Sequence, residues 1–371
     1  MPSQVRSSKQ AAPVRRVGKG PAPTGVVETK NHLLIEIAEW ADADEAQRAC
    51  FDLARSSALD SSVAERAAFI ASEAAVNILK HAGEGRQLLR VMWEAAPVVE
   101  IIALDRGPGI THLGAAMRGG YSTSGDPGAG LCAMSRAANL FDIYSRPGQG
   151  TALLARVSRA RGPGDYAARR DHAQPRVKSG VISTPKAGTQ SGEWTISDAW
   201  AAKHQPSRSL VMVADGLGHG AEAAMAATEA VSVIERVHAL SPAEILEEVH
   251  ETLGGTRGAS VAVAEIRLSG SAPEVRFAGV GNIAARVVNG DRAVHLVSLN
   301  GIAGYEAEIQ EFTYPWPAHS ALVLHSDGLA PQWNAGDYPG LLASHPALIA
   351  AVLHRDFNRG LDDATVVVAK Q

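Results

Sequence analysis

Val211-Met-Val-Ala-Asp-Gly-Leu-Gly-His-Gly220 is an apolar run that ends in one carboxylate, followed by three glycines and a histidine. The alanine-rich segment after it, 221–238, predicts a helix. A strand that delivers an aspartate into such a turn can present a ligand at a sheet edge, because glycine lets the backbone approach closely. A phosphate loop is disfavoured, since Gly-x-x-x-x-Gly-Lys-Ser/Thr is absent. Taken alone, the stretch also fits a plain helix start in which Asp215 forms a turn.

Other carboxylates occur in comparable settings, next to small residues at the ends of predicted strands. They are Asp198, Asp327 and the pair Asp362-Asp363. Converging carboxylates without an opposing lysine or arginine repel one another, and divalent cations relieve that repulsion. All-oxygen ligands favour Mg²⁺ or Mn²⁺ over zinc, and two such ions can activate water and clamp a phosphoryl group. The recurrence favours a metal site over the simpler alternative of unrelated Asp-Gly turns.

The order of these motifs resembles the metal-dependent type 2C (PPM) Ser/Thr phosphatases, in their SpoIIE-like branch. The motifs are Ser197-Asp-Ala-Trp200, Val213-Ala-Asp-Gly-Leu-Gly-His-Gly220, Ala278-Gly-Val-Gly-Asn282, His325-Ser-Asp-Gly328 and Asp362-Asp-Ala-Thr365. The resemblance implies a PPM-type αββα sandwich over residues 176–371.

The same resemblance implies a set of ligands for two Mn²⁺ or Mg²⁺ ions. Asp215 would bridge both ions, with the Gly216 carbonyl assisting. The carboxylates that complete the set would be Asp198, Asp327 and Asp362, with Asp363 as the competitor for the last place. One departure is Ser197, where the family usually has glycine. His219 is expected to start a helix, and Asn282 to fix a turn, rather than to act on substrate.

A second group of motifs lies in the N-terminal half. Glu73 and Asn77 are four residues apart on a predicted helix and therefore share a face. An Asn carbonyl suits Mg²⁺, and a Glu one turn away could act as a base. Three glycine-rich turns follow, each of which could equally be a structural turn: Asp105-Arg-Gly-Pro-Gly109, Gly128-Ala-Gly130-Leu131 and Gly148-Gln-Gly150-Thr151.

This order resembles the Bergerat (GHKL) ATP-binding fold, and within it the anti-sigma-factor and stressosome switch-type Ser/Thr kinases. The motifs are Ser72-Glu-Ala-Ala-Val-Asn77, Asp105-Arg-Gly-Pro-Gly-Ile110, Gly120-Tyr-Ser-Thr-Ser124, Gly130-Leu131 and Ser145-Arg-Pro-Gly-Gln-Gly-Thr151. The resemblance implies that Asn77 holds Mg²⁺, Glu73 assists phosphoryl transfer and Asp105 reads adenine. It also implies a lid over 111–129 and a nucleotide border formed by Gly107, Gly109, Gly128, Gly130 and Thr151.

The composition of the 371 residues limits the possible partners and location of the protein. The net charge of −4 gives no global argument for a nucleic acid or membrane partner. Two cysteines fit a reducing, cytoplasmic location, and no apolar run suggests a membrane span. The expected organisation is a disordered basic tail at 1–25, an ATP-binding domain at 26–157, a linker at 158–175 and a phosphatase domain at 176–371.

Hydrophobic periodicity predicts an α+β chain. A helix is expected over 61–81, started by a capping box of Ser62 and Glu65. The other helices are predicted at 42–58, 131–140, 221–238, 242–253 and 340–355.

The combined hypothesis is a bifunctional signalling regulator. An ATP-dependent kinase domain would phosphorylate a Ser or Thr of a STAS-type antagonist or stressosome protein, and the phosphatase domain would remove such phosphates. Alternatively, the N-terminal domain is a non-catalytic, ATP-gated module that holds a sigma factor or a phosphatase activator. An oligomer is left open.

Overall fold

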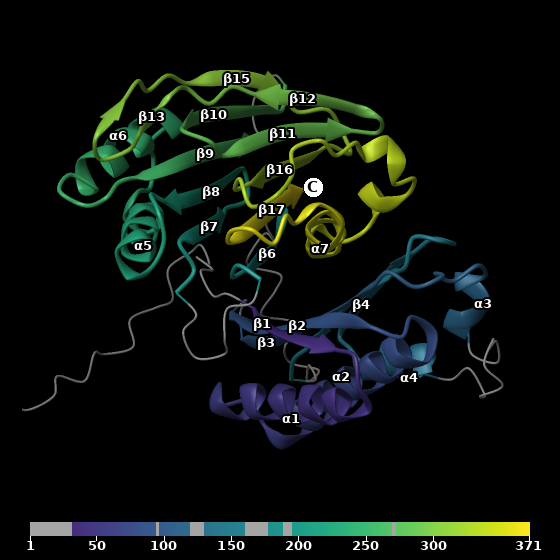
Figure 1. Cartoon of the computed structure of the whole chain (residues 1–371). Helices are drawn as coiled ribbons and strands as arrows, with labels where there is room; N and C mark the ends of the chain where they lie inside the picture. Colours follow the sequence, from purple (N-terminus) through teal and green to yellow (C-terminus); the bar gives the residue numbers. More distant parts are fainter. Residues whose placement is uncertain (1–31, 94–95, 119–129, 160–176, 188–194, 269–271) are drawn as a thin grey trace, which may run out of the picture.

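The computed structural model describes residues 32–93, 96–118, 130–159, 177–187, 195–268 and 272–371 (Figure 1). The predicted tail, most of the predicted lid with Gly128, and most of the predicted linker lie outside these ranges. No helix among the described residues is long and apolar enough to cross a membrane. Below, the N-terminal half means the described residues up to 159, and the C-terminal half means those from 177 onward.

An antiparallel sheet with helices on one face forms the N-terminal half. Its strand order is β1-β2-β3-β5-β4. The strands are β1 (Leu33–Ile37), β2 (Gly85–Trp93), β3 (Pro97–Asp105), β4 (Leu140–Ser145) and β5 (Thr151–Val157), and the helices are α1 (Trp40–Ser56), α2 (Ser61–His81), α3 (Leu113–Arg118) and α4 (Gly130–Ala137).

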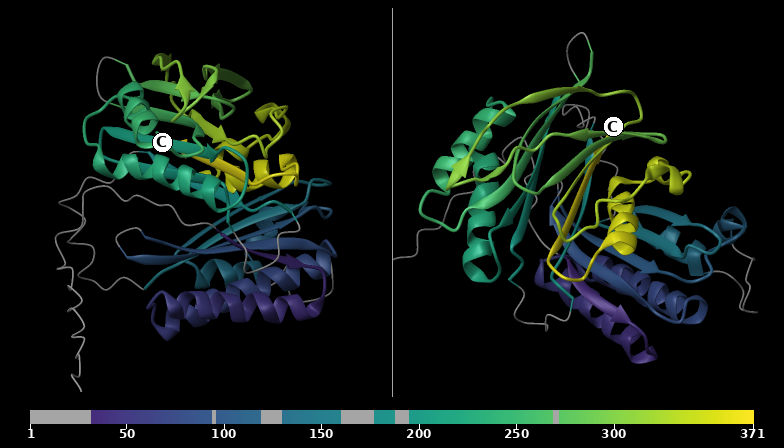
Figure 2. Two further views of the ribbon diagram at one scale, coloured as in Figure 1. Left: turned by 60° about the vertical axis from the view of Figure 1, so that its left-hand side comes forward. Right: turned by 45° about the horizontal axis from the view of Figure 1, so that its top comes forward.

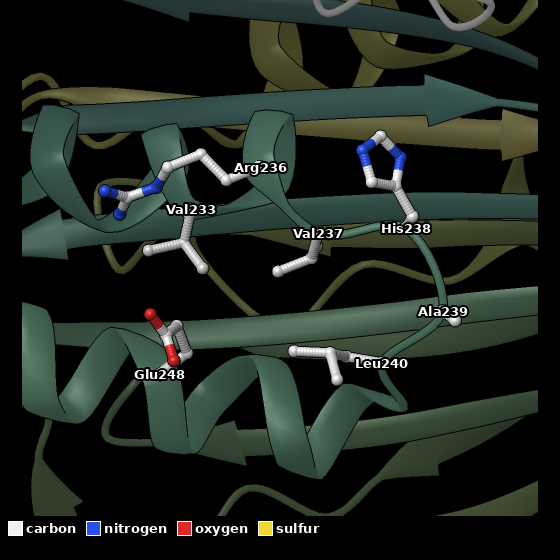
Figure 3. A pocket seen from close by; sticks show the side chains of 7 residues that line it. All are labelled: Val233, Arg236, Val237, His238, Ala239, Leu240 and Glu248. Carbon is white, nitrogen blue, oxygen red and sulfur yellow. The ribbon is translucent and has the colours of Figure 1, made fainter.

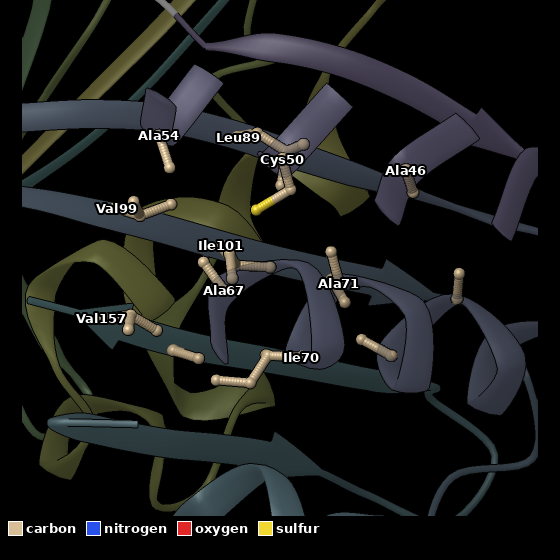
Figure 4. Packing of buried hydrophobic residues seen from close by; sticks show 14 of the residues in the cluster. Ala46, Cys50, Ala54, Ala67, Ile70, Ala71, Leu89, Val99, Ile101 and Val157 are labelled. Carbon is tan, nitrogen blue, oxygen red and sulfur yellow. The ribbon is translucent and has the colours of Figure 1, made fainter. Parts of the chain in front are cut away.

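Small side chains allow the helices to approach this sheet closely. The inner face of α2 is alanine-rich, and Ala67 and Ala71 are fully buried beside Ile70 (Figure 4). Ile101 of β3 and Cys50 of α1 pack into the same cluster. Because alanine has the highest helix propensity and little bulk, the sequence supports a helix here and tight packing at once.

The structure corrects several N-terminal expectations. Helix α2 is capped by Asp60, whose carboxylate accepts a hydrogen bond from the Val63 amide at 2.9 Å, so the expected Ser62–Glu65 capping box is wrong. Helix α1 begins at Trp40, two residues early, because Glu39 and Asp42 form a capping box there. The predicted helix over 131–140 ends at Ala137, and the unpredicted strand β4 follows because its residues pair with β5.

Antiparallel sheets packed face to face form the C-terminal half, with strand orders β15-β10-β9-β8-β7 and β12-β11-β16-β17-β6. Trp200, Phe277 and Leu322 fill the space between them. The strands of the first sheet are β7 (Asp198–His204), β8 (Arg208–Gly216), β9 (Ala259–Arg267), β10 (Glu274–Val280) and β15 (Phe312–Pro315). Those of the second are β6 (Lys178–Thr184), β11 (Ala284–Asn289), β12 (Arg292–Leu296), β16 (Ala321–His325) and β17 (Ala364–Lys370).

Helices cover the outer faces of this sandwich, which confirms the predicted αββα arrangement. Helices α5 (Ala221–Arg236) and α6 (Pro242–Thr252) pack on the first sheet, and α7 (Pro346–Phe357) packs on the second. The predicted helix at 340–355 is too early, because Pro346 starts α7 at a position where its missing N–H costs nothing. The short hairpin β13 (Gly301–Ile302) and β14 (Glu306–Ala307) was not predicted.

Helix α7 also forms the layer between the two halves (Figure 2). One of its faces packs on β6 and β17, while the other packs on the N-terminal sheet through Leu88, Ile102 and Leu154. Nearly every residue of α7 is buried, as expected for a helix that is apolar all round. The two halves therefore share a hydrophobic cluster around α7, in addition to the clusters within each half.

A buried ionic cluster adjoins this shared layer. Glu100 of β3 receives hydrogen bonds from Arg90 Nε and Arg156 Nε, each at 2.7 Å. Burial would raise the pKa of Glu100, but the two guanidiniums outweigh it and hold the pKa well below its usual range. Arg90 also lies over the ring of Trp200 in the C-terminal half, 5.5 Å from the centroid. The charge network thus reaches across the interface.

Glu100→Gln is expected to destabilise the protein by about 3 kcal/mol, because it removes the buried carboxylate that both guanidiniums contact. Since the folded pKa of Glu100 is depressed, its stabilisation is present above about pH 4.5 and is lost as pH falls through the folded pKa. Urea denaturation at neutral and acidic pH measures this. The control is Glu36→Gln, which removes an exposed pair with Arg86 at 3.9 Å and should cost less than about 1 kcal/mol.

Candidate functional site

Asp198 and Asp215 lie opposite each other on neighbouring strands. Asp198 opens β7 and Asp215 lies near the end of β8, and the two residues are paired in the antiparallel register. The Gly216 amide donates to the Ser197 carbonyl at 2.9 Å, which fixes this register at the sheet edge. Pairing across strands places the two carboxylates on one face, as facing residues of a sheet share a side.

Asp327 and Asp362 approach from the second sheet. Asp327 follows β16 and Asp362 precedes β17, and these strands are paired. Ser326 joins the two sheets, since its hydroxyl donates to Asp198 Oδ2 at 2.6 Å and accepts from the Thr365 amide at 3.0 Å. The structure therefore brings all the sequence-predicted carboxylates of this group to one end of the sandwich.

Burial and mutual repulsion raise the pKa values of carboxylates in this group. Burial, followed by the charges of Asp198, Asp327 and Asp362, raises the pKa of Asp215 to about 8. Burial is also the main cause that raises the pKa of Asp198 to about 7. Such shifts mean that the ionised carboxylates are disfavoured here without a countercharge, and divalent cations supply such a countercharge.

Asp362 and Asp363 have different surroundings. Asp363 is buried, and its Oδ2 accepts from both the amide and the hydroxyl of Ser197 at 2.6 Å, while its Oδ1 accepts from the Lys186 amide at 2.8 Å. Asp362 is exposed and uses one oxygen for the Asp363 amide. Asp363 is thus occupied by structural contacts, and Ser197 ties the start of β7 to the final strand. Of the pair, Asp362 is the one available to a ligand.

The carboxylates are not preassembled around a single point. Among the described residues, no group of three or more His, Cys, Asp and Glu side chains could hold a metal ion as it stands. Protein donors occupy some of the oxygens instead, such as Ser326 on Asp198 and Asn282 on Asp327. The donor chemistry nevertheless fits hard divalent cations, because every candidate ligand is an oxygen.

Asn282 is a site residue that sequence reasoning assigned only to a turn. Its Nδ2 donates to Asp327 Oδ2 at 2.8 Å, and its side chain also hydrogen-bonds to Asp215, which offsets a small part of the rise in the pKa of Asp215. Asn282 thus orients a carboxylate from each sheet. The signal in the sequence was its position directly after Gly279-Val-Gly281, at the end of strand β10.

Asn282→Ala is expected to weaken Mn²⁺ binding by about 10- to 100-fold, because residues that orient ligands typically contribute that much. Isothermal titration of the metal-free protein with Mn²⁺ measures the effect. Asn289→Ala is a matched control, since Asn289 donates to the Ala318 carbonyl at 2.8 Å, away from the carboxylates. Equal Mn²⁺ affinity in the two variants would contradict the orienting role.

The glycines of the two Asp-Gly turns allow close backbone packing. A Cβ on Gly216 would lie 2.0 Å from the Ala223 carbonyl oxygen, and one on Gly328 would lie 2.0 Å from that of Asp363. Gly216 lets β8 pass directly under α5, and Gly328 lets the Asp327 turn touch the Asp363 segment. His219 is exposed immediately before α5, in line with the expected helix-start role.

The predicted phosphate end of a nucleotide site lies in the N-terminal half. Glu73 and Asn77 lie on α2, and Gly130 starts α4 beside them. A Cβ on Gly130 would lie 3.1 Å from Glu73 Oε2 and 3.8 Å from Asn77 Nδ2. The structure therefore brings these three predicted residues together, although Gly128 lies outside the described residues.

The predicted adenine end is built from two interlocked turns. Asp105 Oδ1 accepts from the amides of Gly107 at 2.8 Å and Thr151 at 3.1 Å, which leaves Oδ2 for a ligand. Burial raises the pKa of Asp105. Gly109 has a φ of +69°, and a Cβ there would lie 2.0 Å from the Arg146 carbonyl oxygen. The glycine is therefore required for the turns to fit together.

A separate hollow of about 360 Å³ lies between the end of α5 and α6 (Figure 3). Val233, Arg236, His238 and Glu248 are among the residues that line it. None of the predicted carboxylates or nucleotide residues is part of this lining. We assign no chemistry to it.

Comparisons with known proteins agree with this two-part geometry. Residues 205–371 match the family described as stage II sporulation protein E (SpoIIE). The N-terminal region is 40% identical over 85 residues to the serine/threonine-protein kinase RsbT of Bacillus subtilis (strain 168). That match covers 23% of this chain and 64% of the relative, so the chain spans less than two thirds of the length of RsbT.

Solved structures show looser likenesses. One is RsbX in complex with magnesium, with 18% identity and a TM-score of 0.44 over 52% of this chain and 94% of that chain. Another is the PP2C phosphatase domain, with a fragment of the regulatory domain, of SpoIIE from Bacillus subtilis; it has 16% identity and a TM-score of 0.44 over 76% of this chain and 81% of that chain. The likeness to the SpoIIE family rests on the sequence match of residues 205–371.

Proposed function

Because residues 205–371 match the SpoIIE family, we propose that residues 176–371 form a phosphatase domain of this type and remove phosphate from a Ser or Thr of a partner protein. Asp215 would bridge two Mn²⁺ or Mg²⁺ ions, with the Gly216 carbonyl assisting. The remaining ligands would be Asp198, Asp327 and Asp362. Bound metal ions would supply a water activated for attack on phosphorus.

One observation supports this most directly. Asp198 and Asp215 face each other on paired strands, and burial together with the charges of Asp198, Asp327 and Asp362 raises the pKa of Asp215 to about 8. A divalent cation would offset the repulsion between these carboxylates and let them ionise at neutral pH. Asn282 would hold Asp327 and Asp215 in orientation, and Ser326 would hold Asp198, through the hydrogen bonds described above.

We propose that residues 26–157 bind ATP with Mg²⁺ and transfer phosphate to a protein. Glu73 would assist the transfer and Asn77 would hold Mg²⁺. Asp105 would accept a hydrogen bond from the adenine amino group, and the residues bordering the nucleotide would be Gly107, Gly109, Gly128, Gly130 and Thr151. The convergence of Glu73, Asn77 and Gly130, and the RsbT likeness, support this assignment.

The partner that fits both activities is a STAS-type antagonist or a stressosome-type protein, which one half would phosphorylate and the other dephosphorylate. Two opposed sites on one chain act on a tethered partner at high effective concentration. The test is to incubate the Asp215→Asn variant, which cannot erase the product, with ATP, Mg²⁺ and candidate STAS proteins. Phosphoserine formation supports the kinase; its absence with every candidate argues for the alternative below.

The alternative is that the N-terminal half is an ATP-gated module that regulates the phosphatase without transferring phosphate. The packing of its sheet against α7 favours this alternative, since α7 leads directly to the Asp362 segment. Dephosphorylation of a phosphorylated STAS protein, followed with and without ATP, distinguishes the two. A module without transferase activity changes the rate but never regenerates the phosphoprotein.

A further inference from the structure

The C-terminal end of α7 contacts residues 105–109, which form one turn of the predicted adenine site and are called the adenine turn. Arg355 lies on α7 and is 6% exposed, and its Nη1 donates to the Asp105 carbonyl at 3.0 Å. In return, Arg106 Nη2 donates to the Arg355 carbonyl. Arg355 of the C-terminal half therefore contacts the backbone of Asp105, the residue that would bind the adenine amino group.

The guanidinium of Arg355 is itself held rigidly. Its Nε and Nη2 donate to the two oxygens of Asp356 at 2.8 and 2.9 Å, and Tyr338 donates to Asp356 Oδ2 at 3.0 Å. This bidentate geometry leaves Nη1 pointing at Asp105 in a fixed direction. An arginine fixed in this way can position the Asp105 turn.

The adenine turn cannot shift without moving its neighbours. A Cβ on Gly150 would lie 2.1 Å from the Asp105 carbonyl oxygen, which is the atom that Arg355 holds. Arg146, from the turn that carries Gly148, donates to the Asp337 carbonyl of the C-terminal half at 3.0 Å. Both turns of the predicted adenine site therefore rest on the C-terminal half.

The same end of α7 is bonded to the Asp327 turn. The Ala330 amide donates to the Phe357 carbonyl at 2.9 Å, and the Arg359 amide donates to the Gly328 carbonyl at 3.0 Å. Leu329 and Asn358 form an antiparallel bridge between the two segments. The chain then continues through Gly360 to Asp362. Segment 355–362 is thus connected to the adenine turn at its start and to the candidate metal ligands at its end.

We propose that Arg355 is a positioning residue of the nucleotide site, contributed by the phosphatase half, and that segment 355–362 couples nucleotide binding to the Asp327–Asp362 metal site. This inference rests on the proposed binding of ATP and of divalent cations. A nucleotide that orders Asp105 restrains Arg355, and through the bonds at Phe357 and Arg359 it restrains the turn that presents Asp327. By linkage, filling the metal site strengthens nucleotide binding equally.

The experiment is hydrogen exchange of the full chain with and without ADP, at constant excess Mg²⁺. In the wild type, ADP is expected to slow amide exchange in peptides covering 356–363 by roughly fivefold or more, the lower end of typical coupling between sites. Arg355→Met removes the hydrogen bond to Asp105 and should abolish this slowing. Arg355→Lys keeps a donor and should restore part of it, which a purely structural role would not predict.

Asp142→Ala is the matched control. It removes a hydrogen bond between the halves at the opposite end of α7, where the His345 amide donates to Asp142 Oδ2 at 2.7 Å. This variant should keep the ADP response. Arg106→Met, which removes the second contact at Arg355, should weaken the response and serves as a second variant if Arg355→Met does not fold.

Binding of ADP, measured by calorimetry on the same samples, distinguishes a failure of the proposed coupling from a failure of the proposed nucleotide site. If ADP binds the wild type but exchange at 356–363 is unchanged, the coupling is wrong and the nucleotide site stands. If Arg355→Met responds to ADP as the wild type does, the positioning role is wrong. If the wild type does not bind ADP at all, the proposed nucleotide site fails and the coupling with it.

Discussion

Asp215→Asn is expected to abolish Mn²⁺-dependent hydrolysis of p-nitrophenyl phosphate, because the variant loses the carboxylate that would bridge both metal ions. The loss should exceed the roughly 10- to 100-fold effect of removing a residue that only orients a ligand. Steady-state rates measured over a range of Mn²⁺ concentrations test this. Asp291→Asn, in the exposed turn between β11 and β12, is the matched control and should retain wild-type activity.

The same substitution should stabilise the metal-free protein. Burial and neighbouring charges raise the pKa of Asp215 from 3.8 to about 8, so the folded state holds a proton that the unfolded state releases. Stability of the wild type in EDTA therefore falls as pH rises from about 4 to about 8. Asp215→Asn removes this loss and should be more stable at neutral pH by about 1 kcal/mol or more.

Added Mn²⁺ should make the wild type more stable than Asp215→Asn. Mn²⁺ stabilises the wild type by binding only its folded state, whereas Asp215→Asn gains little. Thermal unfolding in EDTA and in Mn²⁺ shows both effects in one experiment. If Asp215→Asn keeps Mn²⁺-dependent activity, or gains as much stability from Mn²⁺ as the wild type, the assignment of Asp215 as a bridging ligand is wrong.

Glu73→Gln is expected to reduce phosphoryl transfer from ATP to a STAS-type acceptor by about 100- to 10,000-fold, the usual contribution of a positioned acid or base. Nucleotide binding should be retained, because glutamine keeps the shape of the side chain beside Gly130 and leaves Asn77 in place. The assay is transfer of labelled phosphate in an Asp215→Asn background, with ADP affinity measured in parallel.

Glu65→Gln supplies the control for the Glu73 experiment, since Glu65 is an exposed residue on the same helix. It should leave both transfer and binding unchanged. Transfer that persists in Glu73→Gln would reject the catalytic role of Glu73. Transfer that is absent even with Glu73 intact would favour the non-catalytic, ATP-gated module.

The predicted layers were confirmed because hydrophobic periodicity and turn chemistry act locally. The apolar run ending at Asp215 forms β8, and the alanine-rich segment after it forms α5, as expected. Errors arose where a local signal had a stronger competitor nearby. Asp60 caps α2 in place of Ser62, and Pro346 moves the start of α7.

In the candidate sites, the carboxylates could be predicted from the sequence and the residues that orient them could not. Carboxylates placed at strand ends are visible in a sequence, so Asp198, Asp215, Asp327 and Asp362 could all be named in advance, and their roles as metal ligands stay predictions. The orienting groups could not be recognised, because their function exists only through their partners. The sequence around Asn282 predicts only a turn, and the structure is needed to show that its side-chain amide donates to Asp327.

The sequence by itself determined which residues form the two candidate sites, since residue type and spacing specify which oxygens and which glycines lie on each turn. Asp215 in its glycine-rich stretch is the clearest case. Only the tertiary structure decided how the halves relate, because the packing of α7 between two sheets joins residues far apart in the chain. Arg355 meets Asp105 across that packing. No local pattern encodes such a contact, since it depends on where two separately formed surfaces bury their apolar area.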